Sequence, residues 1–368
     1  MQNSTMKTWF VSLAALLLGA FLFAPSALAQ KKDKDVVQIK GGKSEIGKVT
    51  AEDFAGVSLE IKAGQTKVIP WADVAGIDYS NPSGLNEALE ALNSGKLDEA
   101  FTQFEALKNG AGKTRPVLQQ HALYNRALVL QRQGKLDEAA AGYKELFAAF
   151  PRGRYLRLAG ENWINALLTK GDANAAESAV ATINLAAQGA TGIEADLAML
   201  KGRVSESKKG WAEARAAYET AEKAAPAGSS VAQEAQLGRA RCLIGEGKRA
   251  EAETILNDLK KSGSSNVVLA GAWNALGELL TEDGKSKRNT EVLLDALYAH
   301  LRGVVQYQPL PGEPTVEYER ALFDASVVCK YISEVESNGD KKRTYKARSE
   351  ENLARLKREF PNSRFLPK

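Results

Sequence analysis

The sequence predicts a mainly α-helical protein, a right-handed α-solenoid of helix hairpins preceded by a small five-stranded β-barrel. The segment Gly-Lys-Leu-Asp-Glu-Ala occurs at Gly95–Ala100 and again at Gly134–Ala139, which marks an internal repeat with a period of 39 residues. A repeat of this length with helical patterning is typical of stacked hairpins. The hydrophobic pattern has a period of two over residues 36–79 and of 3.6 afterwards, so the fold changes near the turn-rich segment Asn81–Gly84.

Residues 1–29 have the features of a secretory signal peptide. Lys7 supplies a positive charge, Trp9–Phe23 is an apolar stretch, and Ala27-Leu28-Ala29 fits a cleavage site before Gln30. A membrane anchor is the alternative, but a bilayer span needs about 20 apolar residues. We therefore expect an exported protein, periplasmic or extracellular in the cell envelope, with no integral membrane segment after cleavage.

Residues 30–35 are expected to form a flexible lead-in, because the block Lys31–Asp35 mixes charges of both signs. Contact with an anionic envelope surface is the alternative. The chain has 49 basic and 45 acidic residues, a formal net charge of +4. This near balance gives no support for nucleic-acid binding.

Residues 36–80 are predicted to form the barrel. Val57–Lys62 alternates between apolar and polar residues, as a half-buried strand does, and Gly41-Gly42 marks a turn. The order of the last elements, a strand, one helical turn at Trp71–Val74 and a short strand, resembles the end of an SH3-like or Sm-like barrel. Trp71 is either a ligand-binding aromatic residue or a core residue that closes the barrel, and the core is the favoured interpretation.

Residues 81–368 are predicted to form the solenoid, with about seven hairpin copies of which five are clear. Four of the five have a glycine at the hairpin turn, where a helix ends in a left-handed backbone conformation. All five have an alanine five positions later, where the two helices cross and a larger side chain would separate them. The pairs of positions are Gly95/Ala100, Gly134/Ala139, Gly171/Ala176, Lys209/Ala214 (with Gly210 one place late) and Gly247/Ala252.

The repeated positions resemble the tetratricopeptide repeat, and this resemblance covers about residues 84–365. Most copies exceed 34 residues, and insertions around Asp283–Asn289 and Asn338–Arg343 lengthen helices or loops. The second copy matches the family's signature at Ala127, Leu130, Gly134, Ala139, Tyr143 and Pro151. A later copy has the opening pattern at Trp273, Leu276, Gly277, Leu280 and Gly284.

In this family the first helix of each copy lines a concave groove, which suits an extended segment or a partner helix. A clamp for the terminal carboxylate of a peptide is not supported, because Tyr124 and Leu128 occupy two of its places. For each single residue an ordinary solvated face is the favoured interpretation, whereas for the groove as a whole we favour binding. The resemblance places these residues near the groove: Tyr124, Leu128, Gln131, Glu161, Asn165, Arg203, Arg241, Asn274 and Glu278.

Signals for catalysis and for metal binding are weak. Asn109–Thr114 lacks the first glycine of a phosphate-binding loop, because Leu107 stands at that place. His121 and His300 have no neighbours at metal-ligand spacing, and the nucleophile pattern Gly-x-Ser-x-Gly is absent. We predict no catalytic residue, no metal and no cofactor.

The two cysteines, Cys242 and Cys329, are expected to remain free thiols in the core. They lie in helical segments of different copies. Because helices pack about 8–10 Å apart, their Cα atoms should exceed the distance of about 7 Å that a disulfide allows.

These observations predict an exported, non-catalytic scaffold that binds a protein partner in the cell envelope through the concave groove. The alternative is a carbohydrate- or cell-wall-binding module with the barrel as its recognition unit. Trp71 and Tyr79 are the barrel's obvious aromatic candidates for a sugar site. The sequence identifies neither the partner nor the oligomeric state.

Overall fold

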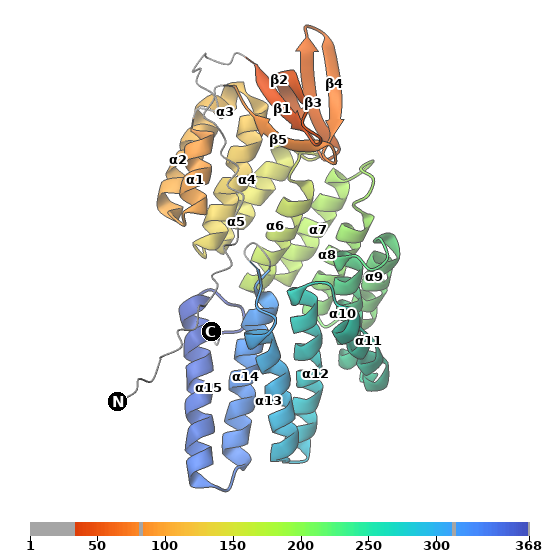
Figure 1. Ribbon diagram of the computed structural model, residues 1–368, viewed down its shortest axis with the longest axis vertical. Helices are drawn as coiled ribbons and strands as arrows, with labels where there is room; N and C mark the ends of the chain where they lie inside the picture. The colour runs from red at the N-terminus through yellow and green to blue at the C-terminus, as the bar shows by residue number, and fades with distance from the viewer. Residues whose placement is uncertain (1–33, 81–83, 311–313, 367–368) are drawn as a thin grey trace, which may run out of the picture.

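The computed structural model describes residues 34–80, 84–310 and 314–366, so the predicted signal peptide lies outside the described residues. Five strands come first and helices follow (Figure 1). The strands are β1 (Asp35–Ile39), β2 (Ser44–Glu52), β3 (Gly56–Lys62), β4 (Gln65–Pro70) and β5 (Val74–Asp78). The helices are α1 (Leu85–Asn93), α2 (Leu97–Asn109), α3 (Ala111–Thr114), α4 (Pro116–Arg132), α5 (Leu136–Ala149), α6 (Leu156–Lys170), α7 (Ala173–Ala186), α8 (Glu194–Ser207), α9 (Trp211–Ala224), α10 (Ser230–Gly245), α11 (Arg249–Ser262), α12 (Asn266–Ser286), α13 (Thr290–Val305), α14 (Val316–Val335) and α15 (Gly339–Glu359).

The five predicted strands are confirmed, but they form an open antiparallel sheet in the order β4-β3-β2-β1-β5. β2 pairs with β1 through its first half and with β3 through its second half, and the register shifts between Val49 and Ala51. The expected closed barrel is therefore not formed. The apolar face that closure would have buried packs instead on the first helices, since Val37 and Leu59 share one core with Leu85 and Leu118.

A buried carboxylate joins the sheet to the helices. Asp35 is fully buried and accepts hydrogen bonds from the backbone N–H groups of Val49 (2.7 Å) and Ser80 (2.6 Å). Arg115, just before α4, donates to both carboxylate oxygens of Asp35 at 2.6 Å. The expected flexible lead-in thus ends earlier than predicted, because Asp35 already belongs to β1.

The hairpin geometry agrees with the repeated residues. The turn glycines Gly95, Gly134, Gly171 and Gly247 have φ values of 73°, 76°, 88° and 76°. In the copy without a glycine at this place, Lys209 itself adopts a φ of 59°. The alanines at the helix crossings are completely buried: Ala100, Ala139, Ala176, Ala214 and Ala252.

The inserted residues of the last two copies lengthen helices and not loops. α12 has 21 residues, α14 has 20 and α15 has 21, whereas α8, α9 and α11 have 14 each. Residues 283–286 continue α12, and α15 starts at Gly339. The lower part of the molecule in Figure 1 is therefore a bundle of longer helices.

The first helices of successive hairpins form the inner layer of the solenoid. α4, α6, α8, α10, α12 and α14 contact one another in series, while the second helices contact mainly the first helices of their own and the next hairpin. Residues on the exposed face of this inner layer consequently line the concave side.

Both cysteines are free and buried, as predicted. Cys242 and Cys329 belong to different hydrophobic clusters. Burial raises the pKa of the Cys242 thiol to about 12 and that of Cys329 to about 11, so neither is a reactive thiolate near neutral pH.

Candidate functional site

The middle of the concave side carries a row of paired charges centred on Arg203. Its guanidinium on α8 donates to Glu161 of α6 (2.8 Å) and to Glu234 of α10 (3.1 Å). The three side chains are between 26% and 36% exposed, so they line the surface and are not part of the core. One arginine thus connects three consecutive hairpins.

The row continues with an ion pair that spans two hairpins. Arg241 Nη2 of α10 lies 2.6 Å from Glu317 Oε1 of α14, across the intervening α12. α12 has a glycine where the pair passes, and a Cβ at Gly271 would lie 3.4 Å from both side chains. Asn274 on α12 donates to the backbone oxygen (2.8 Å) and the carboxylate (3.3 Å) of Glu317. Such a span requires a strongly curved inner layer.

The surrounding charges keep two members of this row, Arg203 and Glu317, ionised. Burial opposes ionisation of Glu317, but Arg241 and Arg320 together with Asn274 lower the pKa of its carboxyl to about 2. Burial likewise lowers the pKa of Arg203, yet Glu161 and Glu234 raise it above its ordinary value. Arg203 and Glu317 are therefore charged, whereas burial raises the pKa of Glu234 above its ordinary value. We call the set Glu161, Arg203, Glu234, Arg241 and Glu317 the concave charge row.

The predicted groove residues fall into three groups. Glu161, Arg203 and Arg241 belong to the concave charge row. Tyr124 and Asn274 are buried, at 7% and 1% exposure: Tyr124 stacks on Tyr155 with ring centroids 3.9 Å apart, and Asn274 holds Glu317 by hydrogen bonds. The remaining four are half-buried or exposed on first helices: Leu128, Gln131, Asn165 and Glu278.

Several charged residues of the groove were missed by the sequence analysis. Glu234 and Glu317 complete the ion pairs of two predicted arginines, and Arg320 lies 3.9 Å from Glu317. The sequence signal for Glu317 is its place three residues before Arg320, which puts the two charges on one face of the helix. The ion pairs themselves join residues of different hairpins, so the spacing of residues within one hairpin cannot predict them.

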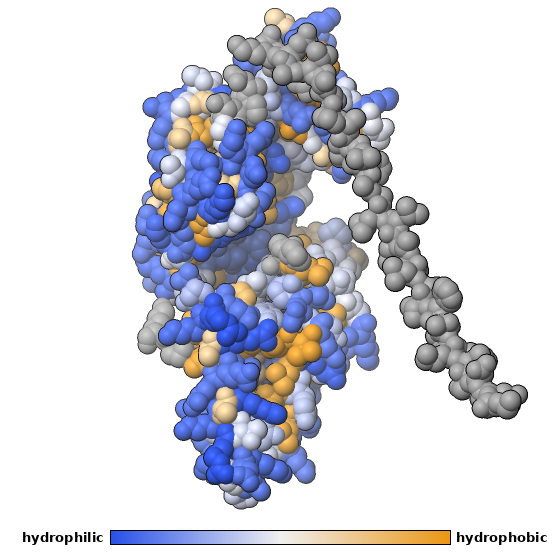
Figure 2. All heavy atoms as spheres, turned by 60° about the vertical axis from the view of Figure 1, so that its left-hand side comes forward, coloured by the Kyte–Doolittle hydropathy of each residue, from blue (hydrophilic) through white to orange (hydrophobic). Residues whose placement is uncertain are grey.

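The end of the chain turns back toward the concave side. After α15, Phe360, Phe365 and Leu366 pack in a cluster with α14, and the ring of Phe365 lies 6.2 Å from that of Phe323. Asn362 reaches the turn between α4 and α5, where a side chain at Gly134 would overlap it. Figure 1 shows this end between the two halves of the molecule, and Figure 2 shows the hollow that separates them.

A second polar cluster lies at the junction of sheet and helices. His121 of α4 is held between the hydroxyl groups of Tyr79 (2.9 Å) and Tyr155 (2.6 Å). Glu52 at the end of β2 accepts from Arg154 at 3.1 Å and from Tyr79. Burial opposes ionisation of Glu52, but His121 and Arg154 lower its pKa below the usual range.

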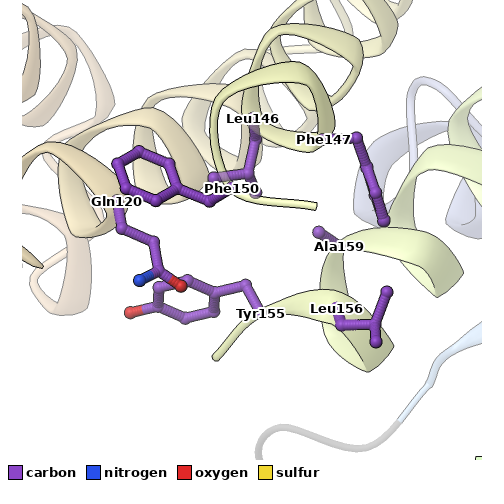
Figure 3. Close-up of a pocket in the computed structure, with 7 residues that line it drawn as sticks. All are labelled: Gln120, Leu146, Phe147, Phe150, Tyr155, Leu156 and Ala159. Atoms are coloured by element: carbon purple, nitrogen blue, oxygen red, sulfur yellow. The ribbon is translucent and has the colours of Figure 1, made fainter. Parts of the chain in front are cut away.

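The small gap next to this cluster is a packing defect and no ligand site. It lies between α4, α5 and α6, and it is too small to hold a water molecule. Figure 3 shows Gln120 and Tyr155 on one side of the gap, with Phe150 above them, and the remaining apolar residues of α5 and α6 around the rest. Its lining residues are Gln120, Leu146, Phe147, Phe150, Tyr155, Leu156 and Ala159.

The aromatic residues of the sheet are used inside the molecule. Trp71 Nε1 donates to the backbone oxygen of Asp53 (2.8 Å), and the guanidinium of Arg154 lies 4.6 Å from the centroid of its indole rings. Tyr79 is engaged by Glu52 and His121. Both aromatic residues are half-buried and are held by contacts within the molecule.

No described helix is long and apolar enough to span a bilayer. Within residues 34–80, 84–310 and 314–366, no three His, Cys, Asp or Glu side chains are grouped so that they could hold a metal ion.

The geometry defines an α-solenoid of helix hairpins with an N-terminal sheet. The family model described as Tetratricopeptide repeat matches residues 121–152, which contain most of α4 and all of α5. No curated protein matches the chain.

Among solved structures, the chain is similar to a tetratricopeptide repeat protein from Parabacteroides merdae ATCC 43184, with 18% identity, a TM-score of 0.47 and coverage of 73% of this chain and 97% of that one. It is also similar to BtubC (BKLC) from P. vanneervenii, with 17% identity, a TM-score of 0.40 and coverage of 62% and 92%. A third similar structure is the C-terminal part of a TPR repeat-containing protein from Cytophaga hutchinsonii, with 14% identity, a TM-score of 0.39 and coverage of 75% and 95%. These likenesses are too distant to bear on function.

Proposed function

We propose that the protein is an exported, non-catalytic scaffold that binds a protein partner in the cell envelope through its concave groove. The concave charge row is the observation that carries this proposal. The signal-peptide pattern of residues 1–29 supports export. The inner layer supplies the extended concave surface that solenoids use to hold a partner.

The charge row favours a partner segment of mixed charge. Its acidic and basic groups alternate along α6, α8 and α10, and each is held by a neighbour while remaining partly exposed. Because these side chains are already fixed, a partner that matches their order would lose little side-chain entropy at the interface. Charges arranged in this way contribute more to specificity and to the association rate than to affinity.

The proposal can be tested by recovery of envelope proteins with the intact mature chain. The variant Asn165→Arg together with Glu278→Arg places two long cations in the groove at positions without ion pairs. We expect this double variant to lose a partner that the wild-type protein retains. The matched control is Lys144→Glu on the exposed face of α5, which should retain it. Equal recovery by the double variant and the wild type would contradict binding in the groove.

A further inference from the structure

A pocket outside the concave charge row lies between α11, α12 and α13. Its volume is about 480 Å³, within the range of small-molecule sites in proteins. Trp273 of α12 forms part of its wall, and Tyr298 of α13, which is 62% exposed, stands at its edge. The three helices occupy the lower right of Figure 1.

One end of this pocket is basic. Lys260 Nζ of α11 and the guanidinium carbon of Arg302 of α13 each lie 4.3 Å from the centroid of the Trp273 rings. Their hydrogen-bond partners are the uncharged side chains of Asn257 (3.1 Å) and Gln306 (3.0 Å). In the part of the chain that the structure describes, no carboxylate lies within ion-pair distance of either cation. Arg302 contributes, after burial, to a lowered pKa of Lys260.

The indole group of Trp273 also carries a donor that no described residue uses. Trp273 Nε1 is buried and has no hydrogen-bond partner among the described residues. A buried polar group without a partner costs free energy, which a ligand oxygen could recover.

The opposite end of the pocket carries both signs of charge, because Arg249 lines it and lies 2.7 Å from Glu253. Glu253 of α11 and Asp295 of α13 each stand seven residues before the cation on the same helix. At a rise of 1.5 Å per residue, the two ends are therefore roughly 10 Å apart along the helices. Between them the wall is apolar, with Leu276, Leu279 and Leu280 of α12.

We propose that this pocket binds a carboxylate attached to an apolar body. The carboxylate lies at Lys260 and Arg302, and the apolar body lies along the leucines of α12. The same chemistry is present in the C-terminus of a peptide that ends in apolar residues and in a free fatty acid.

Calorimetric titration of the intact mature protein distinguishes these ligands. The probes are N-acetyl-Leu-Leu with a free carboxylate, the same peptide with a C-terminal amide, and decanoate below its micellar concentration. We expect the free acid of at least one type to bind and the amide to bind roughly tenfold more weakly. Binding of the peptide acid alone assigns the site to peptide C-termini, and binding of decanoate alone assigns it to fatty acids.

Two variants and a control connect the binding to this pocket. Lys260→Gln and Arg302→Gln should each weaken binding of the acid by roughly tenfold. Lys144→Gln, an exposed lysine on α5, should leave the affinity unchanged. Circular dichroism of each variant shows whether it remains folded, and the two cation variants provide independent tests if one of them unfolds.

The proposal is overturned if neither acid produces heat at millimolar concentration. It is overturned equally if the amide binds as tightly as the acid, or if the cation variants bind as the wild type does. None of these results bears on the concave groove, because Lys260 and Arg302 lie outside the concave charge row.

Discussion

Glu317 on α14 is 4% exposed, yet its carboxyl remains ionised because Arg241, Arg320 and Asn274 surround it. Its pKa of about 2 lies below the ordinary value of 4.5. The unfolded chain therefore binds this proton more readily than the folded chain does. The ion pair thus stabilises the fold above pH 4.5, and this contribution is lost as the pH falls toward 2.

We expect Glu317→Gln to lower the free energy of unfolding at pH 7 by roughly 3 kcal/mol, because Arg241 then loses its buried counter-charge. Between pH 4.5 and 2 the variant should lose less stability than the wild type does. Urea unfolding at pH 7, 4.5 and 3 measures both effects.

Glu334→Gln is the matched control, since Glu334 is exposed near the end of the same helix. It should leave both the stability and its pH dependence within about 0.5 kcal/mol of the wild type. A Glu317→Gln protein with an unchanged acid dependence would contradict the assigned role of this carboxylate.

Asp35 has a comparable role at the other end of the molecule. Replacement by Asn removes the charge that Arg115 binds, and we expect a loss of roughly 3 kcal/mol in the free energy of unfolding. The exposed Asp73→Asn, in the turn before β5, should change it by less than about 0.5 kcal/mol. Chemical denaturation of both variants checks this, and equal stabilities would show that the ion pair does not fasten the sheet to α4.

At the scale of elements, the hairpin turns show which contacts are local and which are not. Gly95, Gly134 and Gly247 have nearly the same backbone conformation, with φ between 73° and 76°. A Cβ would meet nothing within 4 Å at Gly95 or Gly247, but at Gly134 it would overlap the side chain of Asn362. The same turn therefore has an additional neighbour in one copy alone of these three.

This difference gives a matched set of variants. Gly95→Ala and Gly247→Ala should each cost about 1 kcal/mol, the ordinary cost of a left-handed backbone for a residue with a Cβ. Gly134→Ala should cost roughly 1–3 kcal/mol more, because Asn362 must move. Asn362→Ala in the Gly134→Ala background should recover the additional cost.

Thermal or urea unfolding of the four proteins measures these differences. Equal costs at all three glycines, or no recovery by Asn362→Ala, would show that the end of the chain does not rest on the α4–α5 turn.

The same comparison explains how much of the fold the sequence could predict. The turn glycine and the crossing alanine act within one hairpin, so spacing alone located them, and Lys209 shows that the backbone conformation persists even without the glycine. Asp35 and Arg115 are 80 residues apart, and Arg241 and Glu317 belong to hairpins that are not adjacent. Such pairs depend on the curvature of the whole solenoid, which local periodicity does not contain.

The sequence likewise predicted some residues of the candidate site and missed others. The register of the first helices identified Glu161, Arg203 and Arg241, because position in a repeat determines which face a residue occupies. It could not separate Tyr124, which is buried against Tyr155, from its exposed neighbours. It also missed Glu317, whose role depends on a partner from another hairpin.

At the scale of the whole molecule, the N-terminal sheet and the segment after α15 both contact the early hairpins. The sheet contacts the segment before α6, where Phe54 N–H donates to the backbone oxygen of Arg152 at 2.8 Å. The other end places Asn362 against the α4–α5 turn. These contacts connect the sheet and the C-terminal segment to the same early hairpins.

Site-specific photo-crosslinking in living cells tests the central claim most directly. A photoreactive phenylalanine analogue at Asn165 or Glu278 reports on the groove, and the same analogue at Lys144 or Glu334 reports on exposed positions elsewhere. The account predicts that one envelope protein is captured from the groove positions and not from the other two. Capture from Lys144 or Glu334 alone, or equal capture from all four positions, would contradict partner binding by the concave groove.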